Sequence, residues 1–132
     1  MSKGGFRDLN VYKLAYKCAM DIYSLSKSFP KEETYSLTDQ IRRSSRSVCT
    51  NIAESYRKRI YPKNFISKLS DSDAECAETT VHLDFALNCN YISKEKHYQL
   101  ITEYEQIGRM LGSMMSNPEK FVIKKLPTAA AN

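Results

Sequence analysis

Residues 36–59 read SLTDQIRRSSRSVCTNIAESYRKR, and their apolar side chains recur with the period of an α-helix. Ser36 stands just before the pattern and Asp39 follows three positions later, a variant of the capping box that predicts the start of a helix. Small side chains at Ser44, Cys49 and Ala53 flank the apolar stripe and favour close packing against another helix. The stripe consists of Ile41, Ser45, Val48, Ile52 and Tyr56. The segment therefore predicts an amphipathic helix that runs to about residue 59.

Three further segments carry the helical period, at about 9–27, 62–88 and 94–116. Phe29-Pro30 ends the first pattern, Tyr61-Pro62 separates the second from the third, and Asn117-Pro118 ends the last, because a residue before proline disfavours the helical conformation. A turn at 88–91 separates the third pattern from the fourth. Ser93 is expected to cap the last helix. Long helices joined by short links predict an all-α fold, an antiparallel up-down-up-down four-helix bundle over residues 1–116. Residues 117–132 are expected to form a flexible tail.

Each of these helices has its own apolar seam. In the first segment the seam is Val11, Ala15, Cys18, Ile22 and Leu25. In the third it is Phe65, Leu69, Cys76, Leu83 and Leu87, with Ser72 and Thr80 between them. In the fourth it is Ile101, Tyr104, Ile107, Leu111 and Met114 or Met115. Gly108 and Gly112 lie four positions apart, and such a costly pair within a helix predicts a close helix crossing.

Composition excludes several classes of protein. The chain has 132 residues, which suits one domain, and 42% hydrophobic with 27% charged residues is ordinary for a globular protein. Neither a membrane-spanning run nor a signal-peptide block stands out, so a cytoplasmic protein is expected. The four cysteines contain no C-x-x-C pair and the two histidines are not four apart, so we expect no metal and no cofactor. All four cysteines are expected inside helical patterns and are interpreted as core thiols.

Positive charge is concentrated in one segment. Residues 40–59 hold six basic side chains and one acidic one, and this equals the net charge of +5 of the whole chain. Residues 71–84 hold five acidic side chains with no Lys or Arg. A basic element followed by an acidic one suits binding to a polyanion or pairing between subunits.

The arginines of the second helix fall on one side of it. Arg42, Arg46 and Arg57 share an arc of the helical wheel with Thr50, and Arg59 follows. Arginine suits bidentate contact with phosphate, so these four arginines are the candidate nucleic-acid-binding residues. Two other interpretations stay open at this point: a solvated face, and packing against the acidic side of a neighbouring helix or subunit.

A row of polar residues on the same helix has heptad spacing. Polar side chains at such spacing set the register between subunits, so we predict an oligomer interface, with Glu78 added from the acidic segment. The residues of the row are Gln40, Arg43, Ser47, Asn51 and Glu54.

The sequence does not pair a nucleophile with a poised base, so the protein is not expected to be an enzyme. A ligand pocket lined by Tyr16, Tyr56 or Tyr104 would change that expectation.

Three motifs together resemble a known family. The chain opens with Phe6-Arg7-Asp8-Leu9-x-Val11-Tyr12 and continues with Phe29-Pro30-x-Glu32-Glu33-x-Tyr35-x-Leu37-Thr38-x-Gln40. The most specific block is Gln40-Ile41-Arg42-Arg43-Ser44-x-x-Ser47-Val48-x-x-Asn51-Ile52-Ala53-Glu54. These motifs resemble the four helix bundle protein family, whose members include proteins encoded in intervening sequences of 23S ribosomal RNA genes. The accessory variability protein of diversity-generating retroelements is similar.

The resemblance implies a homo-oligomer, with a pentameric barrel as the expected arrangement, and no enzymatic activity. For the retroelement relatives it implies binding to nucleic acid and to a reverse transcriptase. Fold alone does not fix function, so the link to RNA rests on analogy.

Two hypotheses follow. In the first, a non-enzymatic oligomer binds structured RNA, or DNA, through the arginine face, and repeated copies of the face act by avidity. Stacking of single-stranded bases is not expected, because the chain lacks a sheet with interleaved aromatic residues. In the second, the protein is an interaction scaffold whose arginine face pairs with Asp71, Glu75 and Glu78 between subunits.

Overall fold

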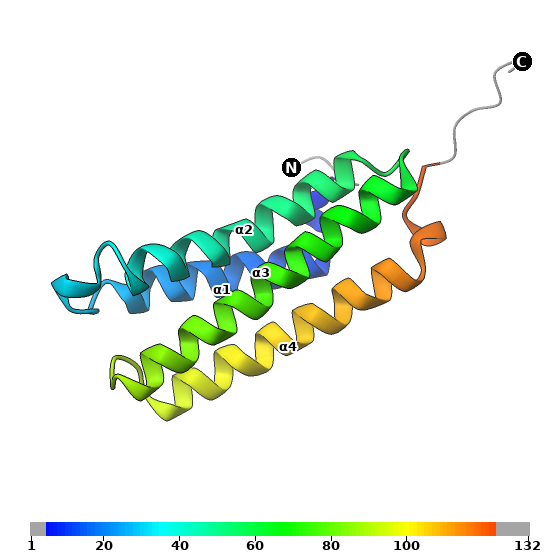
Figure 1. Cartoon of the computed structure of the whole chain (residues 1–132). Helices are drawn as coiled ribbons and strands as arrows, with labels where there is room; N and C mark the ends of the chain where they lie inside the picture. The colour runs from blue at the N-terminus through cyan, green and yellow to red at the C-terminus, as the bar shows by residue number, and fades with distance from the viewer. Residues whose placement is uncertain (1–4, 124–132) are drawn as a thin grey trace, which may run out of the picture.

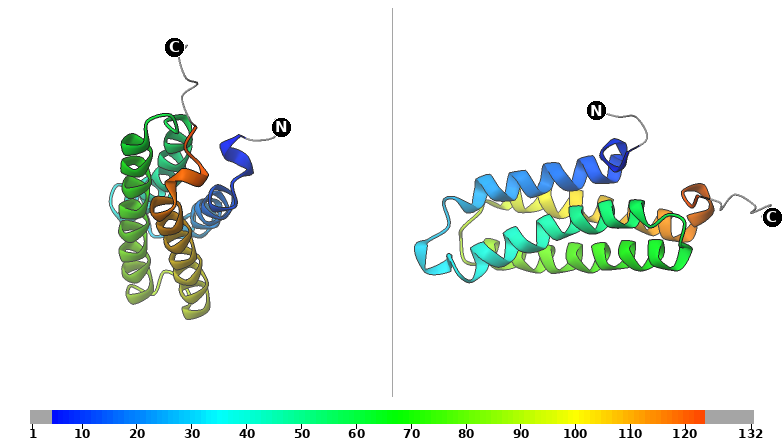
Figure 2. Two further views of the ribbon diagram at one scale, coloured as in Figure 1. Left: turned by 90° about the vertical axis from the view of Figure 1, so that its right-hand side faces the viewer. Right: turned by 90° about the horizontal axis from the view of Figure 1, so that it is seen from above.

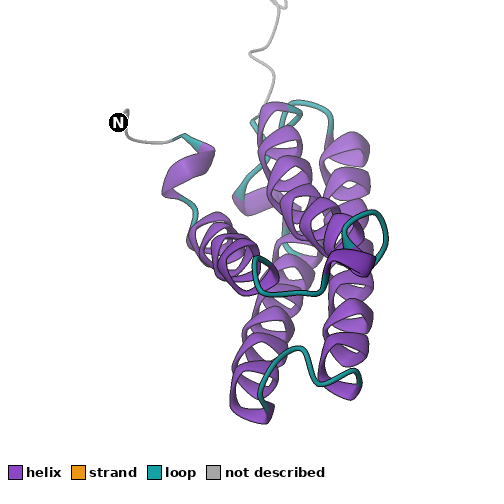
Figure 3. Ribbon diagram, turned by 90° about the vertical axis from the view of Figure 1, so that its left-hand side faces the viewer, coloured by secondary structure: helices purple, strands orange, loops and turns teal. Residues whose placement is uncertain are grey.

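A computed structural model describes residues 5–123. Four helices dominate it: α1 (Asn10–Ser26), α2 (Leu37–Arg57), α3 (Pro62–Asn88) and α4 (Lys94–Ser116). Short 3-10 turns, η1 (Phe6–Asp8), η2 (Lys31–Glu33) and η3 (Pro118–Lys120), flank them, and the described range contains no strand (Figure 3). The predicted all-α fold is confirmed. Successive links lie at alternate ends of the molecule (Figure 1), consistent with the predicted up-down-up-down order.

The helices pack as a ring. α1 contacts α2 and α4, and α3 contacts α2 and α4, so α2 and α4 lie diagonally opposite each other (Figure 2). The core holds apolar side chains from all four helices. Its largest fully buried members are Tyr104, Phe65, Ile22, Ile41, Ile52, Leu69, Leu83, Leu100, Ile107, Leu111 and Val48. Such burial is the main stabilising contribution to a bundle of this size.

The seam of α3 differs in detail from the prediction. Thr79 and Ala86 are fully buried, in place of Thr80 and Leu87. Both continue the alternating steps of four and three residues that begin at Phe65, whereas Thr80 and Leu87 lie one position past that line. Similar single-position shifts bury Leu100 rather than Ile101, and Ser55 rather than Tyr56.

The start of α2 also differs from the prediction. Ser36 occupies the position before the helix, but its side chain makes no capping hydrogen bond, so the expected capping box does not form. Instead the Leu37 N–H donates to Glu33 Oε1 at 3.2 Å, and a carboxylate from η2 satisfies the helix start. At the start of α4 the predicted cap is confirmed, with the Lys96 N–H donating to Ser93 Oγ at 3.1 Å.

α2 and α3 form the tightest pair, as the small residues of α2 predict. Ser72 Oγ of α3 donates to the Val48 carbonyl of α2 at 2.8 Å, and the hydroxyls of Ser44 and Thr79 meet at 2.8 Å. A hydroxyl on one helix reaches the backbone of another only where the two helices are close. The close crossing expected at both glycines of α4 is not found at Gly112, where an added Cβ would meet no other element of the described chain within 4 Å. At Gly108 an added Cβ would lie 3.5 Å from Asp73 Oδ1 of α3, which is an ordinary contact.

The packed domain extends beyond the predicted boundary at residue 116. The Phe121 ring stacks on Phe65 with centroids 6.0 Å apart, and the Ile123 N–H donates to the Arg59 carbonyl at 3.2 Å. Residues 117–123 thus pack on the bundle rather than forming a loose tail. The rest of the predicted tail lies outside the described residues.

The cysteines are all free thiols. Cys18, Cys49 and Cys76 are buried as predicted, and burial raises the pKa of Cys49 and of Cys76 to about 12. Cys89 is exposed, which contradicts the expectation of a core position, because it follows the last residue of α3.

Within residues 5–123, no cluster of three or more His, Cys, Asp or Glu side chains is arranged to hold a metal ion. No helix in that range is long and apolar enough to span a membrane.

Candidate nucleic-acid interface

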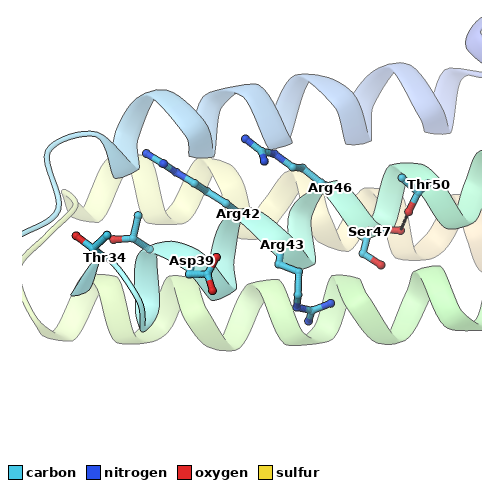
Figure 4. Close-up of a pocket in the computed structure, with 8 residues that line it drawn as sticks. Thr34, Asp39, Arg42, Arg43, Arg46, Ser47 and Thr50 are labelled. Atoms are coloured by element: carbon cyan, nitrogen blue, oxygen red, sulfur yellow. Dashed lines mark hydrogen bonds between the residues drawn. The ribbon is translucent and has the colours of Figure 1, made fainter. Parts of the chain in front are cut away.

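An open groove of about 580 Å³ runs along the outer side of α2 (Figure 4). We call it the arginine groove. It is lined by Thr34, Thr38, Asp39, Arg42, Arg43, Arg46, Ser47 and Thr50. The lining contains three arginines and one carboxylate, so the groove is basic. The arginines diverge: Arg42 and Arg46 extend toward α1, while Arg43 extends toward α3 (Figure 4).

Arg43 is neutralised within the chain. Its Nη1 lies 3.2 Å from Glu75 Oε2, and its Nη2 lies 3.3 Å from Glu75 Oε1 and 2.6 Å from Glu78 Oε2. These hydrogen bonds raise the pKa of Arg43, and the same guanidinium holds the pKa of Glu78 below its usual value. Since α3 carries both carboxylates, this pairing joins two helices of one chain, and it uses Arg43 of the polar row rather than the arginines predicted to pair between subunits.

Arg42 and Arg46 have a different environment. Arg42 Nε donates to Ser26 Oγ of α1 at 2.7 Å, and its Cζ lies 4.9 Å from the centroid of the Tyr23 ring. Arg46 Cζ lies 5.8 Å from the same centroid, and Lys27 Nζ lies 4.8 Å from it. Within the described chain, no carboxylate lies within salt-bridge distance of these three cations. Cation–π contact holds a guanidinium in place without cancelling its charge.

The other two predicted arginines lie outside the groove. Arg57 is exposed in the last turn of α2, on the same side as Arg46 but 11 residues further on, about 16 Å along the helix. Arg59 follows the end of α2, and its Nε donates to the Tyr56 carbonyl at 2.7 Å while its Cζ lies 3.5 Å from the Tyr56 ring. The structure therefore brings Arg42 and Arg46 together and separates both from Arg59.

The predicted polar row of α2 lies along its edge with α3. Asn51 Nδ2 donates to the Ser47 carbonyl at 3.0 Å, and Ser47 Oγ donates to Glu75 Oε2 at 2.9 Å. Glu54 pairs with Lys68 of α3 at 2.9 Å. Gln40 Oε1 accepts from Arg43 Nε at 3.4 Å. Each side chain of the row thus has a partner inside the chain, and its role as an oligomer interface stays a prediction.

The sequence alone did not identify the α1 side of the site. Tyr23, Ser26 and Lys27 contribute the ring, the hydroxyl and an additional cation, yet Tyr23 and Ser26 lie at least 16 residues from the arginines that they contact. The available signal was the placement of Tyr12 and Tyr23, which with Ala19 widen the apolar seam of α1. The three tyrosines considered for a ligand pocket do not share one. Tyr104 is only 2% exposed in the core, whereas Tyr16 is 53% exposed on the surface.

The fold and the groove define a small four-helix bundle protein with a basic surface on its second helix. Residues 7–113 match the family model described as 23S rRNA-intervening sequence protein, and the chain belongs to this family. The predicted resemblance is thereby confirmed. The fold is also similar to the crystal structure of a protein of unknown function from the S23 ribosomal protein family of Bacteroides thetaiotaomicron. The TM-score is 0.73 and the identity 26%, over 80% of this chain and 95% of that one. No curated protein matches the chain.

Proposed function

We propose that this protein is a non-enzymatic binding module that holds the phosphates of structured nucleic acid, RNA above all, with Arg42 and Arg46. The observation that carries the proposal is the contrast among three arginines of one groove. Arg43 is held by two carboxylates, whereas Arg42 and Arg46 rest on an aromatic ring, and within the described chain no carboxylate pairs with them. An unneutralised cation pair on an open surface supplies the electrostatic attraction that dominates nucleic-acid binding.

The donors of Arg42 are arranged for a phosphate. Its Nε is occupied by Ser26 Oγ, so its two terminal nitrogens stay available for the bidentate contact that guanidinium makes with phosphate oxygens. The Tyr23 ring and the Ser26 hydroxyl also restrain the side chain before binding. Restraint of this kind lowers the loss of side-chain entropy when a ligand arrives.

We also propose that the protein acts as a homo-oligomer, with five copies as the expected number. A face of α3 supports self-association, since Val81 is 50% exposed and Phe85, one turn further, is 60% exposed. Several copies of a shallow groove would raise the affinity for a long polyanion through avidity. The mass in solution, measured by light scattering, tests this part of the proposal, and a monomer at micromolar concentration would contradict it.

The test of RNA binding uses a structured RNA and fluorescence anisotropy over a range of salt. Arg42→Ala with Arg46→Ala is compared with Lys94→Ala and Arg109→Ala, which removes two exposed cations from α4, diagonally opposite the groove. The groove variant is expected to lose more than tenfold in affinity at about 0.1 M salt and to lower the log–log salt slope by about 2. Equal losses in both variants would refute the proposal.

The interaction scaffold is a separate outcome of this test. It requires arginines that pair with Asp71, Glu75 and Glu78 of another subunit. Two of these carboxylates already bind Arg43 in their own chain, so the described contacts favour the nucleic-acid proposal. Loss of assembly in the groove variant, with no RNA binding by the natural chain, would favour the scaffold instead.

A further inference from the structure

A second groove, of about 460 Å³, opens on α1 and is lined by two cations and two tyrosines. We call it the tyrosine groove. Its residues are Arg7, Tyr12, Lys13 and Tyr16. In the described part of the chain neither Arg7 nor Lys13 forms a salt bridge, so this groove is basic as well as aromatic. None of the residues expected from the sequence to bind nucleic acid lies in it.

The rings of the groove form a short stack with an open end. The Phe6 and Tyr12 rings meet edge to face with centroids 5.1 Å apart, and the Tyr12 and Tyr16 rings stack at 6.0 Å with planes 29° apart. Arg7 Cζ lies 4.5 Å from the centroid of Phe6, at the other end of the stack. Tyr16 is the outermost ring and is 53% exposed, so it can accept a further planar group.

The tyrosine groove and the arginine groove share one side of the molecule. Tyr12, Tyr16 and Tyr23 are four and seven residues apart, and these steps return to the same side of a helix. Tyr23 is the ring that carries Arg42 and Arg46, so that side of α1 faces α2. Tyr16 lies about 10 Å along the helix from Tyr23, since each residue adds about 1.5 Å. Exposed tyrosine and unpaired cations therefore lie along one seam, the side of α1 that faces α2.

We infer that this seam binds nucleic acid at unpaired nucleotides, with a base stacked on Tyr16 and the flanking phosphates held by Arg7, Lys13, Arg42 and Arg46. The inference rests on the proposed function and specifies its ligand. A base inside a duplex has both faces covered by its neighbours, so only an unpaired base can reach an aromatic ring. A structured RNA with loops or bulges presents such bases. This inference differs from the expectation drawn from the sequence, which considered aromatic residues on a sheet only; here an exposed ring and two cations lie together on helical segments.

The first test compares strands with duplexes. Single-stranded RNA and DNA oligonucleotides, and duplexes of equal length, are titrated against the natural chain, Tyr16→Ala, Tyr16→Phe and Tyr98→Ala. Tyr98 is a matched control, since it is 74% exposed on α4. Tyr16→Ala is expected to weaken binding of single strands by about fivefold or more, and to leave duplex binding within twofold. Tyr16→Phe keeps the ring and is expected to retain affinity, as is Tyr98→Ala.

An abasic strand isolates the stacked base. Removal of the bases is expected to weaken binding of the natural chain to the level of Tyr16→Ala, and Tyr16→Ala is expected to cause no further loss on that strand. The thermal midpoint of Tyr16→Ala should match that of the natural chain, because the side chain is exposed. A Tyr16→Ala effect that is equal on single strands, abasic strands and duplexes would overturn the inference.

The second test uses fluorescence. The chain contains no tryptophan, so Tyr16→Trp introduces a single reporter whose emission is quenched when a base stacks on it. Quenching is expected with single strands and not with duplexes, and Tyr98→Trp is expected to show none with either. If groove arginines affect binding but Tyr16 variants and reporters do not respond, this inference fails and the proposed function stands. If the natural chain binds no RNA or DNA, or only a protein partner, both fail.

Discussion

The two long sides of α2 differ, although each carries arginine. On the side toward α3, Arg43 meets two carboxylates and hydroxyl groups join the helices at 2.8 Å. On the side toward α1, Arg42 and Arg46 lie over the Tyr23 ring at the edge of an open groove. Adjacent positions in the sequence differ by about 100° around the helix, so neighbouring arginines enter opposite environments. One side of α2 thus holds the bundle together, and the other is available to a ligand.

The largest expected effect comes from reversing charge on the open side. Arg42→Glu with Arg46→Glu should abolish retention of RNA on a column at about 0.1 M salt, because phosphate contacts become repulsive. Assembly should survive, since both side chains extend toward α1, away from the exposed face of α3 at Val81 and Phe85 that supports self-association. Light scattering of the same sample checks the mass. Dissociation into monomers with the fold retained would show that this side is an interface between subunits.

A smaller effect is expected from crowding the closed side. Ser72 is fully buried and its hydroxyl reaches the Val48 carbonyl, so Ser72→Leu should lower the free energy of unfolding by about 1–3 kcal/mol. Thr50→Leu is the matched control on the open side, where Thr50 is exposed. It should change the free energy of unfolding by less than about 0.5 kcal/mol. Urea denaturation followed by circular dichroism measures both. Similar values for the two variants would remove the distinction between the sides.

The smallest expected effect is on the stability of the fold at low pH. The pKa of Glu78 is lowered mainly by its hydrogen bond to Arg43, so its ionised form stabilises the folded state above the unfolded value of 4.5. This contribution should be lost as the pH falls through the lowered folded pKa. Because Glu78 is partly exposed, we expect less than about 1 kcal/mol. Urea denaturation at pH 7 and pH 3 measures this contribution. Between these pH values, Arg43→Gln should lose less free energy of unfolding than the natural chain, and an equal loss would argue against the Arg43–Glu78 pair.

The sequence was sufficient for the fold and for part of the site. Periodicity and proline positions predict the helices, because burial of one helical face depends on local spacing. Which arginine is paired with a carboxylate depends on contacts between helices. Arg43 and Glu75 are 32 residues apart, and Arg42 and Ser26 are 16 apart. The same holds for Glu33, which replaces Ser36 as the cap of α2. Spacing within one helix indicated the basic side but not the side chains that meet it.

The most direct measurement of the central claim compares the salt dependence of RNA binding in two variants. Arg42→Gln removes a charge from the open side. Arg43→Gln with Glu75→Gln removes one charge of each sign from the closed side, so net charge is unchanged. The account predicts that Arg42→Gln lowers the log–log salt slope by about 1 and that the paired variant leaves it unchanged. The opposite result, a reduced slope in the paired variant and none in Arg42→Gln, would contradict it.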